Sequence, residues 1–186
     1  MYFDGFYSDP HFFHENIIKY CNRPYKDSFH MNEMMIENYN KIVRKYDTIL
    51  WLGDCFFTKN NDSRKNIMSR LNGKKILLRG NHDDKISDIM LYDLGFSSVF
   101  NTHFLSEIDD HIVRFSHYPH FSDDIDSDKR HKDRRPPIEC GVTLIHGHTH
   151  EKNKITNKNH IHVGVDAWEY APAPYDEVAK LLNTLK

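Results

Sequence analysis

The chain has 186 residues, a formal net charge of -2 and 14 histidines. That length suits a single domain with its own hydrophobic core, and no linker rich in proline, glycine or serine divides it. The 25 Lys and Arg residues are balanced by 27 Asp and Glu residues, so the protein has no overall positive charge with which to attract nucleic acid. No apolar run approaches the roughly 20 residues of a membrane-spanning helix, and no secretory leader precedes the first strand, so we expect a cytoplasmic protein.

Helices and strands alternate through the first half of the chain. Strands are expected at short apolar runs, and helices where apolar residues keep a helical spacing between polar caps. Asn32 is the expected N-cap of the second helix, and Gly95 the expected C-cap of the fourth. The predicted strands are 2–7, 48–52 and 75–79, and the predicted helices are 12–21, 32–45, 62–71 and 84–94.

The pattern changes in the second half of the chain. Tight polar turns such as Asp109-Asp110 separate short apolar runs, which predicts an antiparallel meander. Two later strands are expected to complete the sheet, and an apolar stripe predicts a terminal helix. The meander strands are 97–100, 103–108 and 112–116, the later strands are 142–146 and 160–165, and the helix is 175–185.

Asp, Asn or His follows five of the predicted apolar runs. A buried strand that stops at a polar loop holds the next side chains on a rigid stem, and in three of the five cases glycine lets the backbone turn there. We therefore expect these polar side chains to converge at one rim. The motifs are Asp9-Pro10-His11, Gly53-Asp54, Gly80-Asn81-His82-Asp83, His117 and Gly147-His148-Thr149-His150.

These motifs supply carboxylates, imidazoles and one amide carbonyl. That set of donors suits borderline divalent ions such as Mn, Zn, Fe, Ni or Co better than Ca, which prefers oxygen alone. The donors are too numerous for one ion. Two half-sites of three or four ligands that share a bridging carboxylate would hold two ions about 3.5 to 4 Å apart.

The ordered motifs resemble the calcineurin-like metallophosphoesterase family, in its compact bacterial and phage type. The signature of that family is D-x-H, G-D, G-N-H-[DE], H and G-H-x-H, and every part is present in order between Asp9 and His150. The segment Val165-Asp166-Ala167-Trp168 is also similar. The resemblance implies an α/β fold, a four-layer αββα sandwich of two mixed β-sheets flanked by helices, as one domain over residues 1–186.

The resemblance also implies which residues bind the two divalent metal ions. One ion would have three ligands of its own, the other ion would have three more, and one aspartate would bridge them. The first set is Asp9, His11 and His150, the second set is Asn81, His117 and His148, and the bridge is Asp54.

Other residues near the motifs are candidates for catalysis and substrate binding. By the resemblance, His82 would protonate the leaving oxygen, and Asp83 would orient or charge-stabilise His82. Arg79 is a candidate that either clamps phosphate or pairs with a surface carboxylate. His14 and His120 are candidates for substrate contact, with packing as the alternative.

The implied function is a dinuclear-metal-dependent phosphohydrolase in which a metal-activated water attacks the phosphoester. A small domain without a large cap leaves an open site, which favours phosphodiesters of a nucleotide or nucleic-acid type. The alternatives are a phosphomonoesterase or protein phosphatase of the same fold, a non-catalytic metal-stabilised scaffold for a protein partner, and a nucleic-acid-binding module. The sequence gives no indication of the oligomeric state.

A polar stretch from Ser122 to Pro137 carries charges of both signs and two prolines. Its composition predicts a solvated, mobile loop within 118–138. The alternative is an active-site flap that contacts phosphate through basic residues. The candidates for that contact are Lys129, Arg130, His131, Arg134 and Arg135.

Overall fold

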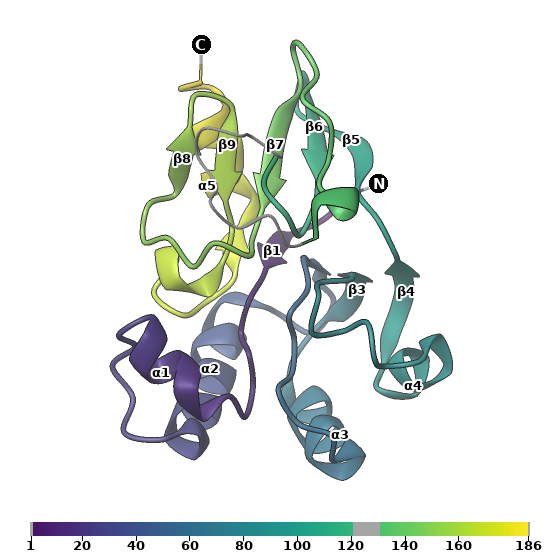
Figure 1. Ribbon diagram of the computed structural model, residues 1–186, viewed down its shortest axis with the longest axis vertical. Helices are drawn as coiled ribbons and strands as arrows, with labels where there is room; N and C mark the ends of the chain where they lie inside the picture. Colours follow the sequence, from purple (N-terminus) through teal and green to yellow (C-terminus); the bar gives the residue numbers. More distant parts are fainter. Residues whose placement is uncertain (1, 121–130, 186) are drawn as a thin grey trace.

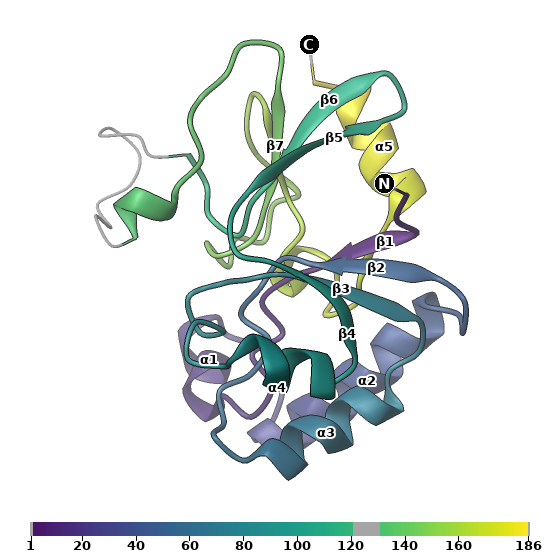
Figure 2. The ribbon, with the colours of Figure 1, turned by 90° about the vertical axis from the view of Figure 1, so that its right-hand side faces the viewer.

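The computed structural model describes residues 2–120 and 131–185. Its strands form two five-stranded mixed sheets, with the orders β10-β1-β2-β3-β4 and β5-β6-β7-β9-β8. Helices α1 to α4 cover the outer face of the first sheet, and α5 packs beside the second sheet (Figures 1 and 2). The predicted α/β sandwich of two mixed sheets flanked by helices is confirmed.

The first sheet is built from parallel strands joined by helices. Neighbouring strands from β1 to β4 all pair in parallel, and the short β10 adds an antiparallel edge. Parallel pairing requires crossover connections, which the helices supply. The elements are β1 (Gly5–Tyr7), α1 (Glu15–Tyr20), α2 (Ser28–Ile42), β2 (Thr48–Trp51), α3 (Asn61–Arg70), β3 (Lys74–Leu78), α4 (Asp88–Asp93), β4 (Phe96–Phe100) and β10 (Ala173–Pro174).

The second sheet combines an antiparallel hairpin with parallel strands. β5 and β6 form the hairpin, β6 to β7 and β7 to β9 pair in parallel, and β8 pairs antiparallel with β9. Among the described residues, every helix is too short or too polar to cross a lipid bilayer. The elements are β5 (Phe104–Ile108), β6 (His111–Phe115), β7 (Thr143–His146), β8 (Ile155–Asn157), β9 (His160–His162) and α5 (Tyr175–Leu182).

Three helix starts differ from the sequence prediction. The first helix begins at Glu15 and not at residue 12, because Phe12 forms a β-bridge with Phe56. Asp27, not Asn32, caps α2, because its side chain accepts a hydrogen bond from His30 N at 2.7 Å. Asn32 lies inside the helix, where its Oδ1 accepts from Phe13 N at 3.0 Å. The fourth helix begins at Asp88, because residues 81–86 form turns instead. Gly95 follows that helix with φ +98°, the left-handed conformation expected there.

The predicted three-strand meander was wrong in its first strand. The run 97–100 belongs to β4, which pairs in parallel with β3 in the first sheet. Only β5 and β6 form an antiparallel pair within this region. β8 and β10 were not predicted, since each is very short and β10 contains a proline.

Aromatic side chains form the core between the two sheets. The ring of Phe6 on β1 stacks on that of Phe115 on β6, with centroids 5.3 Å apart. Phe3 packs edge-on against Phe115 at 5.7 Å, and Leu182 of α5 joins the same buried cluster. This core fixes the position of one sheet on the other, and so the relative position of their strand ends.

Replacing Phe115 tests this coupling of the sheets. We expect Phe115→Ala to lower the free energy of unfolding by about 3–5 kcal/mol, because it removes a fully buried ring and leaves a cavity. Leu105→Ala on the paired strand β5 is the control, since Leu105 is half exposed, and should cost less than about 1 kcal/mol. Urea unfolding measures both, and equal losses would contradict this account of the core.

Candidate metal centre

Backbone hydrogen bonds join the loops that follow the strands of both sheets. The N–H of Asp9 donates to the Gly53 carbonyl at 3.1 Å, and the N–H of His11 donates to the Asp54 carbonyl at 3.1 Å. In the second sheet, Gly147 N–H donates to the His117 carbonyl at 3.1 Å. Across the two sheets, the N–H of His148 donates to Asp9 Oδ2 at 2.9 Å, and within the first sheet the N–H of Asp54 donates to Asp83 Oδ2 at 2.7 Å. Together these hydrogen bonds bring the five polar motifs to one rim.

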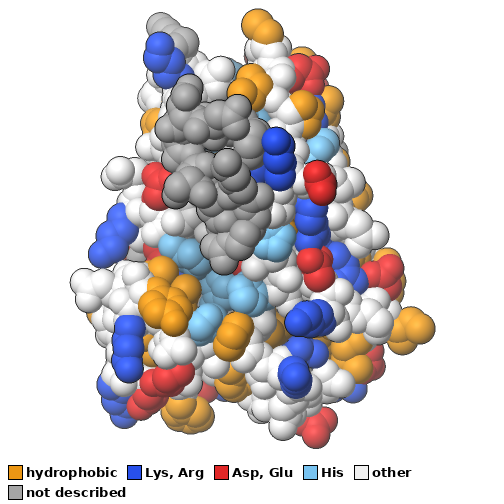
Figure 3. All heavy atoms as spheres, in the orientation of Figure 1, with side chains coloured by type: hydrophobic (Ala, Val, Ile, Leu, Met, Phe, Trp, Pro, Cys, Tyr) orange, Lys and Arg blue, Asp and Glu red, His pale blue; other side chains and the backbone are white. Residues whose placement is uncertain are grey.

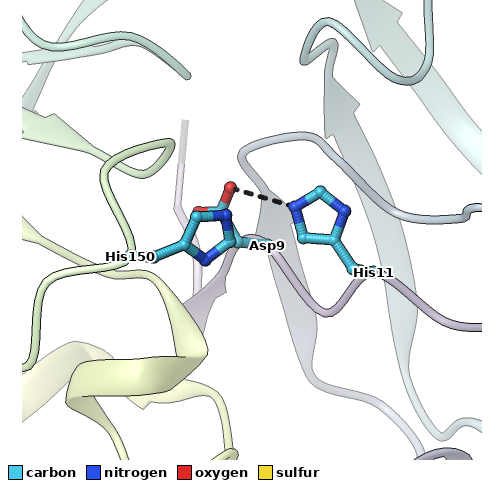
Figure 4. A group of neighbouring side chains, drawn as sticks. All are labelled: Asp9, His11 and His150. Carbon is cyan, nitrogen blue, oxygen red and sulfur yellow. Dashed lines mark ion pairs between the residues drawn. The ribbon is translucent and has the colours of Figure 1, made fainter. Parts of the chain in front are cut away.

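The first group of side chains at this rim is Asp9, His11 and His150 (Figure 4). Each offers one ligand atom, and these atoms lie within 4.8 Å of one another. His11 Nε2 is 4.0 Å from Asp9 Oδ1, and the imidazoles of His11 and His150 have centroids 5.0 Å apart. Side chains from the loop after β1 and the loop after β7 thus point toward one spot.

The second group is Asp54, His117 and His148, whose ligand atoms again lie within 4.8 Å of one another. His117 Nε2 is 3.2 Å from His148 Nδ1. Asn81 Oδ1 is 3.3 Å from the same Nε2 atom, so the amide oxygen of Asn81 adjoins this group.

Asp54 belongs to the second group and also adjoins the first. Its Oδ2 atom is 3.5 Å from His11 Nε2 and 3.5 Å from His117 Nε2. Its Oδ1 atom accepts a hydrogen bond from the His82 N–H at 2.9 Å, which fixes the orientation of the carboxylate. A single buried carboxylate therefore faces both groups.

The backbone at this rim is strained. Left-handed φ values are costly for residues with a side chain, and such strain persists only where the surroundings impose it. Five of the six residues in the two groups have this left-handed backbone conformation. They are Asp9 (φ 59°), His11 (φ 51°), Asp54 (φ 54°), His148 (φ 71°) and His150 (φ 54°).

Two motif glycines let the backbone approach the carboxylates closely. A Cβ at Gly80 would lie 2.2 Å from Asp54 Oδ1, and a Cβ at Gly147 would lie 2.3 Å from Asp9 Oδ2. Any side chain at these positions would displace a carboxylate. The glycines are therefore required by contact with Asp54 and Asp9, and both have φ outside the left-handed range.

Several buried polar atoms at the rim have no hydrogen-bond partner among the residues that the structure describes: Asp9 Oδ1 and both ring nitrogens of His11. Burying such atoms unpaired costs free energy, so native proteins normally satisfy them. A divalent cation would accept electron pairs from these atoms. The mixed carboxylate and imidazole donors fit an ion such as Mn or Zn.

The charge state of the second group follows from its neighbours. Burial alone would lower the pKa of His117, but the Asp54 carboxylate outweighs it and raises this pKa to about 9. Burial and the adjacent His117 lower the pKa of His148 to about 3. His117 Nδ1 lies 2.6 Å from the Leu52 carbonyl, which directs Nε2 toward Asp54. A bound cation would replace the proton on Nε2.

Arg23 and Asp166 support the first group from behind, and sequence reasoning missed their role. Arg23 Nε and Nη2 donate to the two Asp166 carboxylate oxygens at 2.9 and 2.8 Å, and Nη2 also donates to the Asp9 carbonyl at 2.9 Å. Asp166 Oδ2 is 2.9 Å from His150 Nδ1. This pair therefore orients both an aspartate and a histidine of the group. The only sequence signal was the similar segment 165–168.

Asp83 makes different contacts from those expected. Its Oδ2 accepts from the N–H groups of Asp54 and Gly80 at 2.7 and 3.0 Å, and its Oδ1 accepts from Cys55 N–H at 3.1 Å. Among the described residues, the hydrogen bonds of this carboxylate thus go to backbone groups of two loops, and none of them goes to the His82 ring. Asp83 braces the loops that carry Asp54 and His82.

Arg79 pairs with a surface carboxylate, as one of the two alternatives predicted. Its Nη1 donates to the carbonyls of Asp83 and Ile86 at 2.6 and 2.8 Å, and its Nη2 pairs with Asp88. The guanidinium therefore caps the turn after β3. It does not line the cavity at the rim.

A cavity of about 760 Å³ opens over the rim. The His82 side chain is 33% exposed and lines this cavity, with Nε2 3.8 Å from Asp54 Oδ2. Figure 3 shows pale-blue histidine side chains gathered on this face, with orange hydrophobic side chains beside them. His82 could donate a proton to a ligand held over the rim, either directly or through one water molecule.

His14 and His120 also line the cavity. His14 caps α1, since its Nδ1 accepts from Ile17 N at 3.2 Å, and its ring stacks on Phe57 with centroids 3.8 Å apart. Burial and the neighbouring His82 lower the pKa of His14 to about 4, so the ring is uncharged at neutral pH. His120 Nδ1 lies 3.0 Å from the Pro136 carbonyl.

The basic candidates of the polar stretch have varied surroundings. Lys129 and Arg130 lie outside the described residues. Arg134 pairs with Asp84 and lies over the Tyr118 ring at 5.3 Å. His131 lines the cavity, with its ring 6.2 Å from that of His148, and Arg135 is buried.

Fold and rim together define a two-sheet α/β protein with several His and Asp groups that could hold metal ions. The chain is 31% identical over 183 residues to the uncharacterized protein MJ1445 of Methanocaldococcus jannaschii, covering 95% of this chain and 89% of that one. It is 30% identical over 196 residues to the Gene 66 protein of Mycobacterium phage L5, covering 96% and 93%. The chain therefore belongs to the same family as these two proteins.

Of two solved structures that match the chain, one is similar in fold. The protein of unknown function AQ665 from Aquifex aeolicus superposes with a TM-score of 0.70 at 26% identity, over 95% of this chain and 97% of that one. A structure described as a novel archaeal phosphodiesterase reaches a TM-score of only 0.42 at 17% identity, a similarity too low to bear on function. No family model matches the chain.

Replacing Asp166 tests the support of the first group. We expect Asp166→Asn to weaken Mn²⁺ binding about 10–100-fold, because the His150 imidazole loses the carboxylate that orients it. Calorimetric titration of the metal-free protein measures the affinity, and thermal unfolding checks that the variant folds. The control is Asp176→Asn at the exposed start of α5. Unchanged affinity in folded Asp166→Asn would show that Asp166 does not support the site.

Proposed function

We propose that this protein is a dinuclear-metal-dependent phosphohydrolase of the calcineurin-like metallophosphoesterase type. One observation carries the proposal: the Oδ2 atom of the Asp54 carboxylate lies 3.5 Å from a histidine nitrogen in each of two groups of imidazole and carboxylate ligands. A carboxylate shared between two ligand groups is what a pair of adjacent divalent ions requires. The ordered motifs at the strand ends add support from the sequence.

In this proposal the ligands divide as the motifs imply. Asp54 is shared, and the first ion takes Asp9, His11 and His150. The second ion takes Asn81, His117 and His148. When bound, two such ions supply activation of a water molecule and neutralisation of the phosphoryl charge. The unpaired atoms of Asp9 and His11 support this assignment, because a cation would satisfy them.

His82 is the proposed proton donor to the leaving oxygen. Its backbone N–H is held by Asp54 Oδ1, while its ring stands partly exposed in the cavity. The side chain is thereby fixed at its base and open at its tip, as proton transfer to a ligand requires. Asp83 contributes by holding the loop of His82 against the loop of Asp54.

The extent of the cavity supports a phosphodiester as the substrate. The lining residues include one set from α1 and its start, namely His14, Ile17 and Tyr20, and another from the second sheet and its loops, namely His120, His146 and His160. A phosphate held at the rim would thus have lining groups available for two substituents. A monoester would occupy only part of that space.

Substitution of Asp54 or His82 tests the catalytic proposal. We expect Asp54→Asn and His82→Ala each to lower the hydrolysis of bis-p-nitrophenyl phosphate about 100-fold or more, because they remove the shared ligand and the proton donor. The matched controls are Asp62→Asn, on the exposed start of α3, and His111→Ala, at the start of β6. Full turnover in both site variants would refute the proposal.

Metal removal tests the cofactor and separates the alternatives. We expect chelation to abolish turnover, and reloading with Mn, Ni or Zn in turn to restore it to different degrees. With each metal, the rate for bis-p-nitrophenyl phosphate is compared with the rate for p-nitrophenyl phosphate. A faster diester rate is expected, and a faster monoester rate would favour the phosphomonoesterase alternative. A metal-loaded protein inert toward both esters would favour the scaffold.

A further inference from the structure

One wall of the cavity is an aromatic and apolar strip along α1. His14, Ile17 and Tyr20 all line the cavity, and they are spaced three residues apart. Ile17 and Tyr20 therefore share one face of α1, and His14 is the N-cap residue directly before that helix. None of the metal ligands, the proton donor or their supports belongs to this strip.

Tyr20 is the open end of the strip. Its side chain is 75% exposed although it lines a cavity, whereas Ile17 beside it is 5% exposed and packs in the core. Exposed aromatic rings at a cavity provide flat apolar area that a ligand can cover at a low entropic cost. The ring of Tyr20 is thus presented to whatever enters the cavity.

His14 connects the strip to the rim. Its ring centroid lies 5.5 Å from that of His11 and 6.3 Å from that of His82, and it lies 6.3 Å from that of Tyr20 on the other side. Phe57 stacks behind His14 at 3.8 Å and holds the ring in place. The strip therefore begins one ring away from the phosphoryl position of the proposed function.

We propose that this strip binds the base of a nucleoside attached to the phosphate at the rim, with Tyr20 as the stacking residue. The proposal rests on the proposed function for the position of the phosphate. Every base presents a flat π-face, and stacking on aromatic side chains does not require a particular base. The amide of Asn157, which also lines the cavity, offers polar atoms for the sugar or the base.

The many polar groups in the lining argue against a lipid or other long apolar substituent. Besides the strip, the lining is dominated by histidines and includes Glu151, Thr156 and Asn157. An acyl chain in such a cavity would leave polar groups without partners. A base with a sugar offers both a flat face for Tyr20 and polar atoms for the remaining groups.

Binding of a nucleotide and its base-free counterpart tests the proposal without turnover. Mn²⁺-loaded protein is titrated calorimetrically with adenosine 5′-monophosphate and with ribose 5-phosphate. We expect the nucleotide to bind about fivefold tighter or more, which is the contribution of one stacked base. Tyr20→Ala should remove most of this preference and leave the affinity for ribose 5-phosphate unchanged. Tyr20→Phe should retain the preference, because it keeps the ring.

The matched control is Tyr46→Ala, since Tyr46 is 86% exposed and does not line the cavity. Equal affinities for the two ligands in the native protein, or a preference that survives Tyr20→Ala, would overturn the inference. Turnover of bis-p-nitrophenyl phosphate separately tests the proposed function, so the two failures are distinguishable. A short 5′-phosphorylated oligonucleotide distinguishes the two sources of the base. If it binds more tightly than adenosine 5′-monophosphate and its binding weakens with salt, the ligand is the end of a nucleic-acid strand. If the two bind equally, the ligand is a free nucleotide.

Discussion

The arrangement of the site depends on one buried carboxylate, which needs positively charged partners. Asp54 is 2% exposed and lies 3.5 Å from an imidazole nitrogen in each of the two groups. A buried carboxylate needs a positive partner, and here the His117 proton meets that demand, as its raised pKa shows. Divalent cations would meet the same demand more completely. The proposed enzymatic function follows from this position of Asp54 between two sets of donors.

The scaffold holds the two ligand groups in position by imposing strained φ values on the backbone. Left-handed φ values at five of the candidate ligands persist because the neighbouring loops and sheets leave no alternative. The Phe6 and Phe115 stack joins the two sheets, while Arg23 and Asp166 tie Asp9 to His150. Rigid elements with fixed supports hold a metal or substrate site more accurately than free loops do.

Much of the fold was predictable because each element carries local evidence. Apolar runs marked β1, β2, β3, β6 and β7, and helical spacing marked α2, α3 and α5. The failures had non-local causes. Asn32 is a residue type typical of an N-cap. It lies inside α2 instead, where its Oδ1 accepts a hydrogen bond from the N–H of Phe13, 19 residues earlier. β4 joined the first sheet by pairing with β3, and nothing in its own composition distinguishes that pairing from a hairpin.

The sequence by itself determined which donors follow the strands and in which order, because both are written in short motifs. Only the tertiary structure decided which side chains face one another. It directed Asp83 and Arg79 to backbone groups and brought Arg23 to Asp166 across a separation of 143 residues. The physical reason is that a side chain's partners depend on how the two sheets pack, and no local pattern encodes that packing.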